Sequence, residues 1–256
     1  MIKRHTIQSD MKRAICSKGF IMGVAGLFIV IVFASMESII EVTRATEPLQ
    51  NGFHAEFILK SLQSDSFTLA LPILCALPFT TAFVDDIKSG FIKQYLLRTS
   101  RKQYIKGKLV ACGLSGGLVL FIGILAAFQM AYLVFTPMEL ALTEGQTAEP
   151  YLAQLIMKAF ILAISGMFWS LIGFTFAALT MNRYMAYASP LILYYVLIIL
   201  HERYFEWLYV LYPKEWLFPA NEWTLGDLGI ILLIIELALI TGLWFAIIAK
   251  RRLNDA

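Results

Sequence analysis

The sequence holds few residues whose types and spacing could support catalysis or metal binding. Its three histidines, His5, His54 and His201, lie in separate segments, and His201-Glu202 lacks the second histidine of a zinc-binding H-E-x-x-H helix. There is no G-x-x-x-x-G-K-[ST] phosphate loop, and the serines and aspartates are scattered without a nucleophile elbow. We therefore expect no catalytic residue, no metal site and no ATP bound by this chain itself.

One carboxylate lies well inside an apolar run. Glu236 stands roughly 12 Å into the run 228–249, if that run is helical. A carboxylate at such depth is costly and marks a candidate substrate or ion pathway, although a hydrogen bond to a neighbouring helix would also explain it. Gln129, inside the run 109–135, is a further candidate for the same pathway.

A charged segment, 85–108, joins two apolar runs and carries seven of the 21 Lys and Arg residues. Apolar residues recur in it near helical spacing, as in a short amphipathic helix. Asp85 and Asp86 suit the start of a helix, and Gly90 leaves room for close approach. The segment fits either a loop resting on anionic lipid or a docking helix for a soluble partner.

A second segment, 204–219, holds seven aromatic residues in sixteen positions. This composition is typical of an aromatic belt at the membrane interface. It also fits a pair of short helices, broken near Pro213, that dip back into the membrane. In that case Trp207, Tyr212 and Trp216 are the candidate residues of an outer gate.

The elements that must position these residues are transmembrane helices. The chain has 256 residues, of which 59% are hydrophobic and 15% charged, more apolar surface than a soluble domain of this size can bury. We predict an all-α polytopic membrane protein that forms a single domain over residues 1–256. An interfacial helix, 1–18, precedes six spans at about 19–40, 67–84, 109–135, 155–181, 184–200 and 228–249.

The basic residues predict the orientation. Sixteen of the 21 fall at the N-terminus, in 85–108, at Arg183 and at the C-terminus, and these regions share one side of a six-span layout. Arg44, Lys60, Arg203 and Lys214 fall on the other side, and the remaining one, Lys158, lies near the outer end of the fourth predicted span. Both termini and the segment 85–108 are therefore expected in the cytoplasm. The run 19–40 is too long for a cleaved signal peptide.

Several residues of the segment 85–108 resemble the cytoplasmic loop between spans 2 and 3 of ABC-2-type transporter permeases, the membrane subunits of ABC exporters. Those residues are Asp85-Asp86, Ser89-Gly90, Gln94, Leu97, Ser100-Arg101, Tyr104 and Lys108. Within that group the chain is similar to bacterial permeases of peptide-export and lantibiotic-immunity systems, and the layout resembles them over the whole chain.

The resemblance implies a function and partners. The permease would pair with a second permease copy and with two separate ATPase subunits, which bind ATP and magnesium, in a bacterial plasma membrane. A coupling helix would contact the ATPase through Asp85, Asp86, Gly90, Gln94, Leu97 and Arg101. The short polar loops favour a small amphipathic or hydrophobic peptide, such as a bacteriocin, lantibiotic or peptide toxin, as substrate. Membrane lipid is a partner, and nucleic acid is not expected to be one.

Other functions remain open from the sequence. An ABC-2 exporter of drugs or lipids would have the same layout. An ion-coupled secondary transporter would need a carboxylate at midplane, for which Glu236 is the candidate, and an inverted repeat, which is not evident. An intramembrane enzyme would need paired polar residues at matching depth in different spans, and the sequence offers none.

Overall fold

Helices joined by turns and loops make up the part of the chain that the computed structural model describes, residues 2–44, 49–97, 99–140 and 151–254. In chain order, the helices are α1 Ile2–Ile15, α2 Lys18–Ala34, α3 Met36–Arg44, α4 Phe53–Leu62, α5 Asp65–Leu74, α6 Ala82–Lys88, α7 Phe91–Leu96, α8 Arg101–Phe135, η1 Thr136–Met138, α9 Tyr151–Thr180, α10 Arg183–Arg203, η2 Tyr209–Leu211, α11 Pro213–Leu217 and α12 Asp227–Arg252.

Four helices in these ranges, α8, α9, α10 and α12, are long and apolar enough to cross a membrane. The end of α1 and α2 together pass the same test as a pair bent by 48°, which makes up to five. This confirms the predicted all-helical, membrane-type architecture. The long helices overlap the predicted spans 109–135, 155–181, 184–200 and 228–249. The predicted total of six spans is larger than the four or five that these helices can provide.

The first two predicted spans are broken helices. The run 19–40 is divided at Ser35, between α2 and α3. The run 67–84 was expected to kink at Pro72 and Pro78, but α5 ends at Leu74 and residues 75–81 form turns before α6 begins. Proline lacks the N–H of a helical hydrogen bond, which favours a break here. The turns are buried, and the Ser17 hydroxyl donates to the Pro78 carbonyl at 3.1 Å.

The segment 85–108 is not one amphipathic helix. It comprises the end of α6, a turn at Gly90, the short helix α7, and the first two turns of α8, which begins at Arg101. Gly90 has φ 71°, a left-handed conformation that stops α6 and redirects the chain into α7. The Ser100 hydroxyl caps α8 by accepting from the Gln103 N–H. The third predicted span therefore begins about two turns earlier than expected.

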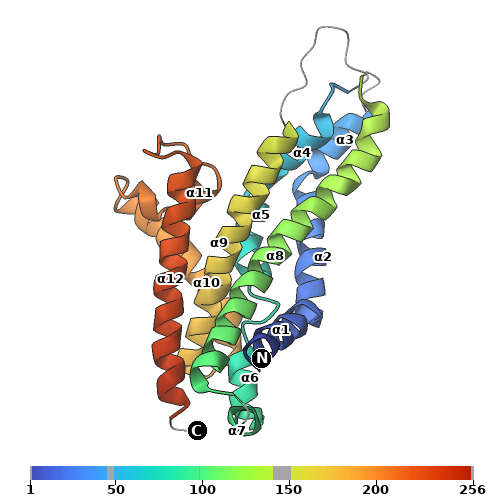
Figure 1. The fold of residues 1–256 in the computed structure, drawn as a ribbon. Coiled ribbons are helices and arrows are strands. Elements are labelled where there is room, and N and C mark those ends of the chain that lie inside the picture. Colours follow the sequence, from blue (N-terminus) through green and yellow to red (C-terminus); the bar gives the residue numbers. More distant parts are fainter. Residues whose placement is uncertain (1, 45–48, 98, 141–150, 255–256) are drawn as a thin grey trace.

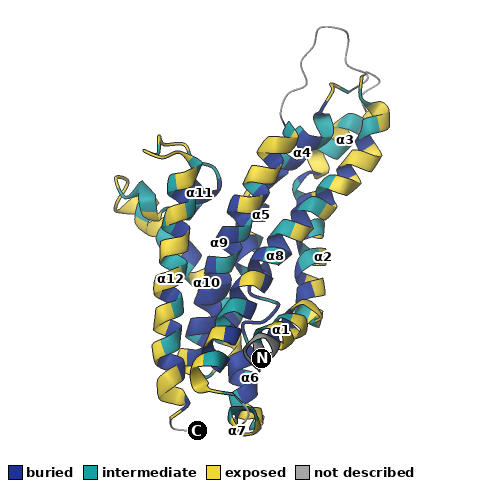
Figure 2. Ribbon diagram, in the orientation of Figure 1, coloured by how far each residue is buried: buried dark blue, intermediate teal, exposed yellow. Residues whose placement is uncertain are grey.

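The helices form one elongated bundle with α8 and α9 at its centre (Figure 1). Both described ends of the chain lie at the same end of the bundle as α7, and α3 and α4 lie at the opposite end. We call these the α7 end and the α4 end. Buried residues line the facing sides of α8 and α9, whereas the outer side of α12 is exposed (Figure 2).

Glycines allow the central helices to approach closely. A Cβ added to Gly116 of α8 would lie 2.5 Å from the Ser170 Cβ of α9 and 2.9 Å from the Cys75 carbonyl oxygen. A Cβ on Gly166 of α9 would lie 3.0 Å from the Gly116 carbonyl oxygen. Small residues at such a crossing are the usual means by which helices associate tightly in membranes.

We expect Gly116→Ala to lower the thermal unfolding midpoint of the protein in mild detergent, because overpacking of a tight contact costs about 1–3 kcal/mol. Tryptophan fluorescence during heating measures this. Gly113→Ala on the same helix is the control, because its new methyl group meets nothing closer than 3.8 Å and alanine favours the helix. Equal effects of the two substitutions would contradict the close contact at Gly116.

Candidate functional site

Charged side chains, three of them buried and that of Arg13 48% exposed, gather where α1, α6 and α8 meet at the α7 end. The Lys108 Nζ of α8 lies 2.9 Å from Asp10 Oδ1 of α1 and 2.8 Å from Asp86 Oδ2 of α6. Arg13 of α1 donates to Asp86 Oδ1 at 2.8 Å, and the Tyr104 hydroxyl donates to Asp86 Oδ2 at 2.9 Å. We call these five residues the charge cluster.

The charges of this cluster balance, with two cations facing two carboxylates. Balance is required because an unpaired charge in a low-dielectric interior is strongly destabilising, and Lys108 is 0% exposed. The Lys108 Nζ also lies 4.9 Å from the ring centroid of Phe79 and 5.4 Å from that of Tyr104, and aromatic faces favour a cation there. Asp10 Oδ2 accepts no hydrogen bond from the described residues.

The crossing of α1 over α8 depends on the residue before Lys108. A Cβ on Gly107 would lie 3.0 Å from Asp10 Oδ2 and 4.0 Å from Ile7 Cγ1. A larger side chain at this position would push α1 away from α8 and lengthen the contact between Asp10 and Lys108. Glycine at 107 therefore allows the buried ion pair to form.

The short helix α7 is attached to the charge cluster from outside. Its Ile92 is 1% exposed, and its Tyr95 ring packs edge-on at 5.3 Å from the Tyr104 ring. Burial, together with the negative charges of Asp10 and Asp86, raises the pKa of Tyr95 to about 12. The phenol is therefore neutral at physiological pH, and α7 is held against the bundle by packing.

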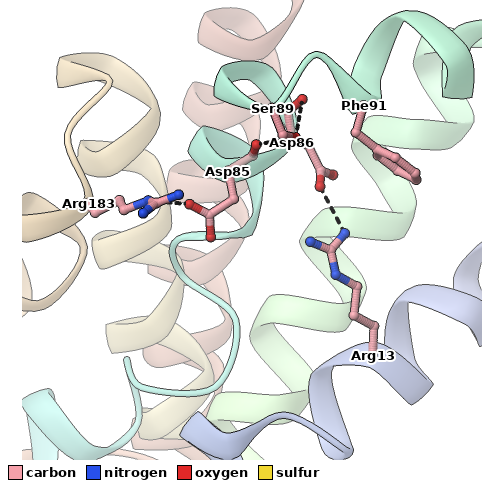
Figure 3. Close-up of a pocket in the computed structure, with 6 residues that line it drawn as sticks. All are labelled: Arg13, Asp85, Asp86, Ser89, Phe91 and Arg183. Carbon is pink, nitrogen blue, oxygen red and sulfur yellow. Dashed lines mark hydrogen bonds and ion pairs between the residues drawn. The ribbon is translucent and has the colours of Figure 1, made fainter.

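A pocket of about 550 Å³ lies beside the charge cluster, lined by Arg13, Asp85, Asp86, Ser89, Phe91 and Arg183. Figure 3 shows that the two adjacent acids point in different directions. Asp86 accepts from Arg13 of α1, whereas Asp85 pairs with Arg183 at the start of α10 and accepts from the Thr81 hydroxyl at 2.9 Å. The two acids thus tie α6 to two separate parts of the bundle.

The remaining predicted coupling residues lie near α7 at the surface. Leu97 is 87% exposed, Gln94 is exposed, and open space surrounds Gly90, where an added Cβ would meet nothing within 4 Å. Arg101 is exposed and donates to the Asn254 side chain near the C-terminus. Gln94 and Leu97 therefore present side chains outward, whereas the Asp86 side chain, at 1% exposed, faces the interior.

The two predicted pathway residues lie on the outside of the bundle. Glu236 is exposed on α12, between Leu232 and Leu239, which are 57% and 64% exposed. No hydrogen bond or ion pair joins Glu236 to another described residue. Gln129 is exposed on α8. Neither residue reaches the charge cluster, and the structure does not bring the two together in one buried site.

The three predicted gate residues have different surroundings. Trp216 is 1% exposed, with its ring 5.7 Å from that of Phe168 and 6.1 Å from that of Trp169 on α9, and its Nε1 donates to the Val210 carbonyl at 2.8 Å. Trp207 is 74% exposed and takes no part in this packing. Trp216 thus anchors α11 to the bundle.

Tyr212 joins the same segment to the end of α10. Its ring stacks on His201 at 4.1 Å, and its hydroxyl donates to Glu202 Oε1 at 2.9 Å. Burial and the hydrogen bond to Glu202 raise the pKa of Tyr212. Nearby, the buried Glu215 accepts from the Ala220 N–H and fixes the turn after α11. Trp216 and Tyr212 therefore hold a structured cap, as short helical pieces on either side of Pro213.

At the α4 end, Glu139, which follows α8 and η1, connects the end of α8 to the start of α4. It accepts from the N–H groups of Gly52 at 3.1 Å and His54 at 2.8 Å, and from His54 Nδ1 at 2.7 Å. Burial alone would raise the pKa of Glu139, but these hydrogen bonds and the His54 charge lower it overall. We call this contact the His54–Glu139 clasp.

Asp10 was not predicted as a site residue, and neither Lys108 nor Glu139 was paired with its partner from the sequence. Asp10 is the sole acid in a basic stretch, 1–18, and Lys108 opens an apolar run without an adjacent acid. An isolated acid before one apolar run and an isolated base before another are a usable sequence signal for a buried ion pair. Its partner could not be identified from spacing, because 98 positions separate the two residues.

Comparison of the sequence with models of known protein families finds no match, and no curated protein is significantly similar to it. Among the described residues, no group of three or more His, Cys, Asp or Glu side chains could hold a metal ion. The charge cluster and the adjacent exposed face of α7 form the candidate functional site.

We expect Lys108→Met to lower the free energy of unfolding by about 3–5 kcal/mol, because, among the described residues, Asp10 then loses its one ion-pair partner and Asp86 one of two. Equilibrium unfolding in mixed detergent micelles measures the change. Arg183→Met is the control, because it breaks a pair whose arginine side chain is 60% exposed and whose loss costs about 0–1 kcal/mol. Similar losses in the two variants would show that the charge cluster is not the stabilising contact.

The His54–Glu139 clasp predicts a dependence of stability on pH. Because the folded state lowers the pKa of Glu139, its contribution is complete above the ordinary carboxyl value of 4.5 and is lost as pH falls through the lower folded pKa. We expect the difference in unfolding midpoint between wild type and Glu139→Gln to shrink below that pH. A difference that stays constant from about pH 6 to about pH 3 would contradict this.

Proposed function

We propose that this chain is the permease subunit of an ATP-driven exporter of the ABC-2 type, and that a separate ATPase subunit docks at the α7 end. The observation that carries the proposal is the exposed face of α7 backed by the charge cluster. Leu97 and Phe91, 87% and 43% exposed, present apolar surface outward, next to the exposed amide of Gln94. Apolar surface surrounded by polar residues is what a protein partner covers.

In this proposal the charge cluster connects the exposed face of α7 to the helices of the bundle. Through Asp86 and its partners, α6 is fixed to α1 and to the first turns of α8, and through Asp85 it is fixed to the start of α10. A partner that pulls on α7 therefore displaces three helices together. Coupling of this kind needs an element with two discrete arrangements, because packed interiors do not deform continuously.

Six membrane crossings are part of the proposal. The broken stretches α2–α3 and α5–α6 would each cross once, in addition to α8, α9, α10 and α12. An even number of crossings agrees with the two described chain ends, which lie at the same end of the bundle (Figure 1). The concentration of Lys and Arg at that end supports a cytoplasmic location for it, in a bacterial plasma membrane.

The substrate we propose is an amphipathic or hydrophobic peptide, such as a bacteriocin, lantibiotic or peptide toxin; drugs and lipids are the alternative cargo. The support is chemical. Charged side chains that are buried within the described ranges lie in the charge cluster, at Glu139 and at Glu215, near the ends of the bundle, so the long central helices face one another with apolar and small residues. Such an interior suits cargo that carries few fixed charges.

In this proposal the chain is not itself catalytic. ATP and magnesium would bind to two copies of the partner subunit, and two permease copies would form the pathway. The exposed side of α12, including Glu236, would face lipid or the second copy. An ion-coupled transporter has less support, because its candidate carboxylate, Glu236, lies on the outside of the bundle.

We expect Leu97→Asp to abolish recovery of an ABC-type ATPase with the tagged, detergent-solubilised chain, and with it the ATP hydrolysis of the eluate. An exposed leucine can be replaced without disturbing the core, whereas a side chain at Gly90 would strain its left-handed backbone and confuse the result. Partner identification by mass spectrometry and an ATPase assay provide the measurement.

Leu225→Asp is the matched control, because Leu225 is 62% exposed but precedes α12 at the end of the bundle opposite α7. It should leave ATPase recovery unchanged. A wild-type chain that purifies without any ATPase would contradict the proposal. Equal loss of ATPase recovery in both variants would contradict docking at α7.

A further inference from the structure

A groove runs between α1 and α8 on the surface of the bundle, on the side of α1 away from the buried Asp10. It has a volume of about 730 Å³. Its apolar walls are Ile7, Met11 and Ile15 of α1, and Val110 and Leu114 of α8. Ile15 and Leu114 are 38% and 40% exposed, so the walls open outward and no side chain among the described residues covers them fully.

The charges around the groove have one sign. Lys12 lines it directly and is exposed. On α8, Lys106 is exposed one turn before Val110, on the same helix face, and Lys102 lies a further turn away. Among the described residues of α1 and α8, the sole carboxylate is Asp10, which is 4% exposed and bound to Lys108. An occupant with a negative head and an apolar body matches this surface.

The groove lies where such an occupant is available. Helix α8 is apolar and long enough to span a membrane, and α1 turns away from α2 by 48° at the α7 end, as an interfacial helix does. Lys12, Lys102 and Lys106 therefore lie near headgroup level, while Leu114 lies further along α8 toward the hydrocarbon. A second copy of this chain fits less well, because a symmetric contact would place the same lysines against one another.

We propose that the α1–α8 groove binds an anionic phospholipid, with one acyl chain along Ile15, Val110 and Leu114 and the headgroup phosphate between Lys12 and Lys106. Phosphate on lysine ammonium groups is a favourable, salt-dependent contact near a membrane surface. The acyl chain covers apolar side chains that otherwise face outward. This inference holds whether or not the chain is an exporter, because it rests on the groove alone.

The test measures lipid binding to the purified full-length chain in mild detergent by native mass spectrometry. Dioleoylphosphatidylglycerol and dioleoylphosphatidylcholine are titrated separately. We expect a tightly bound phosphatidylglycerol and weaker phosphatidylcholine binding. Lys12→Gln and Lys106→Gln should each weaken phosphatidylglycerol binding by about fivefold, and glycerol phosphate alone should not compete. The control pair Lys93→Gln and Lys250→Gln removes the same charge from exposed positions outside the groove and should change binding little.

A second variant tests the groove rather than its charge. Val110→Trp fills the groove and should weaken phosphatidylglycerol binding with every lysine in place. If Val110→Trp does not fold, Leu114→Asp at a 40% exposed position replaces it. Equal binding of the two lipids, equal effects of the two lysine pairs, or full binding to the filled groove would each overturn the proposal.

Discussion

The buried ammonium of Lys108 is the constraint on which the α7 end depends. A lysine without exposed surface must have carboxylates around it, and those come from Asp10 on α1 and Asp86 on α6. Helix α1 is far from α6 and α8 in sequence, with 98 positions between Asp10 and Lys108, so the contact forms only when all three helices are assembled. The ion pairs hold α1 and α6 against α8, and α7, which follows α6 after Gly90, is positioned by that contact.

The break between α5 and α6 follows from the same constraint. A continuous helix from residue 65 to 88 would carry Asp86 along one straight axis. Instead the chain leaves the helix after Leu74 and returns at Ala82, which allows α6 its own direction. Non-helical backbone inside a membrane is tolerated where protein covers it, and Cys75 and Ala76 are each 0% exposed. Pro72 and Pro78 lower the free-energy cost of ending the helix there. The ion pairs of the buried Asp86 then favour the direction that α6 takes.

The sequence was sufficient for the helical class and for the long helices, because hydrophobic length depends on local composition alone. It failed at the breaks. The run 19–40 has the composition of one span, yet the helix is interrupted at Ser35. The Ser35 hydroxyl donates to the Ile31 carbonyl and contacts the Ser61 hydroxyl of α4. The position of α4 relative to this run could not be predicted from residue spacing. Asp85 and Asp86 were predicted together as docking residues, and the structure adds that their side chains point at different helices, toward Arg183 and Arg13 respectively. Direction of a side chain is a property of the assembled bundle.

Helix α1 shows how one short element serves two environments. Asp10 faces inward to Lys108, and Lys12, two positions on, faces the groove, so opposite faces of α1 meet the bundle and the groove. Gly107 sets how closely α1 can approach, and the groove is what remains between the helices on the other side of that contact. Anything that lifts α1 from the groove side also lengthens the Asp10–Lys108 pair. The position of α6, and with it the exposed face of α7, is therefore linked physically to the surroundings of α1.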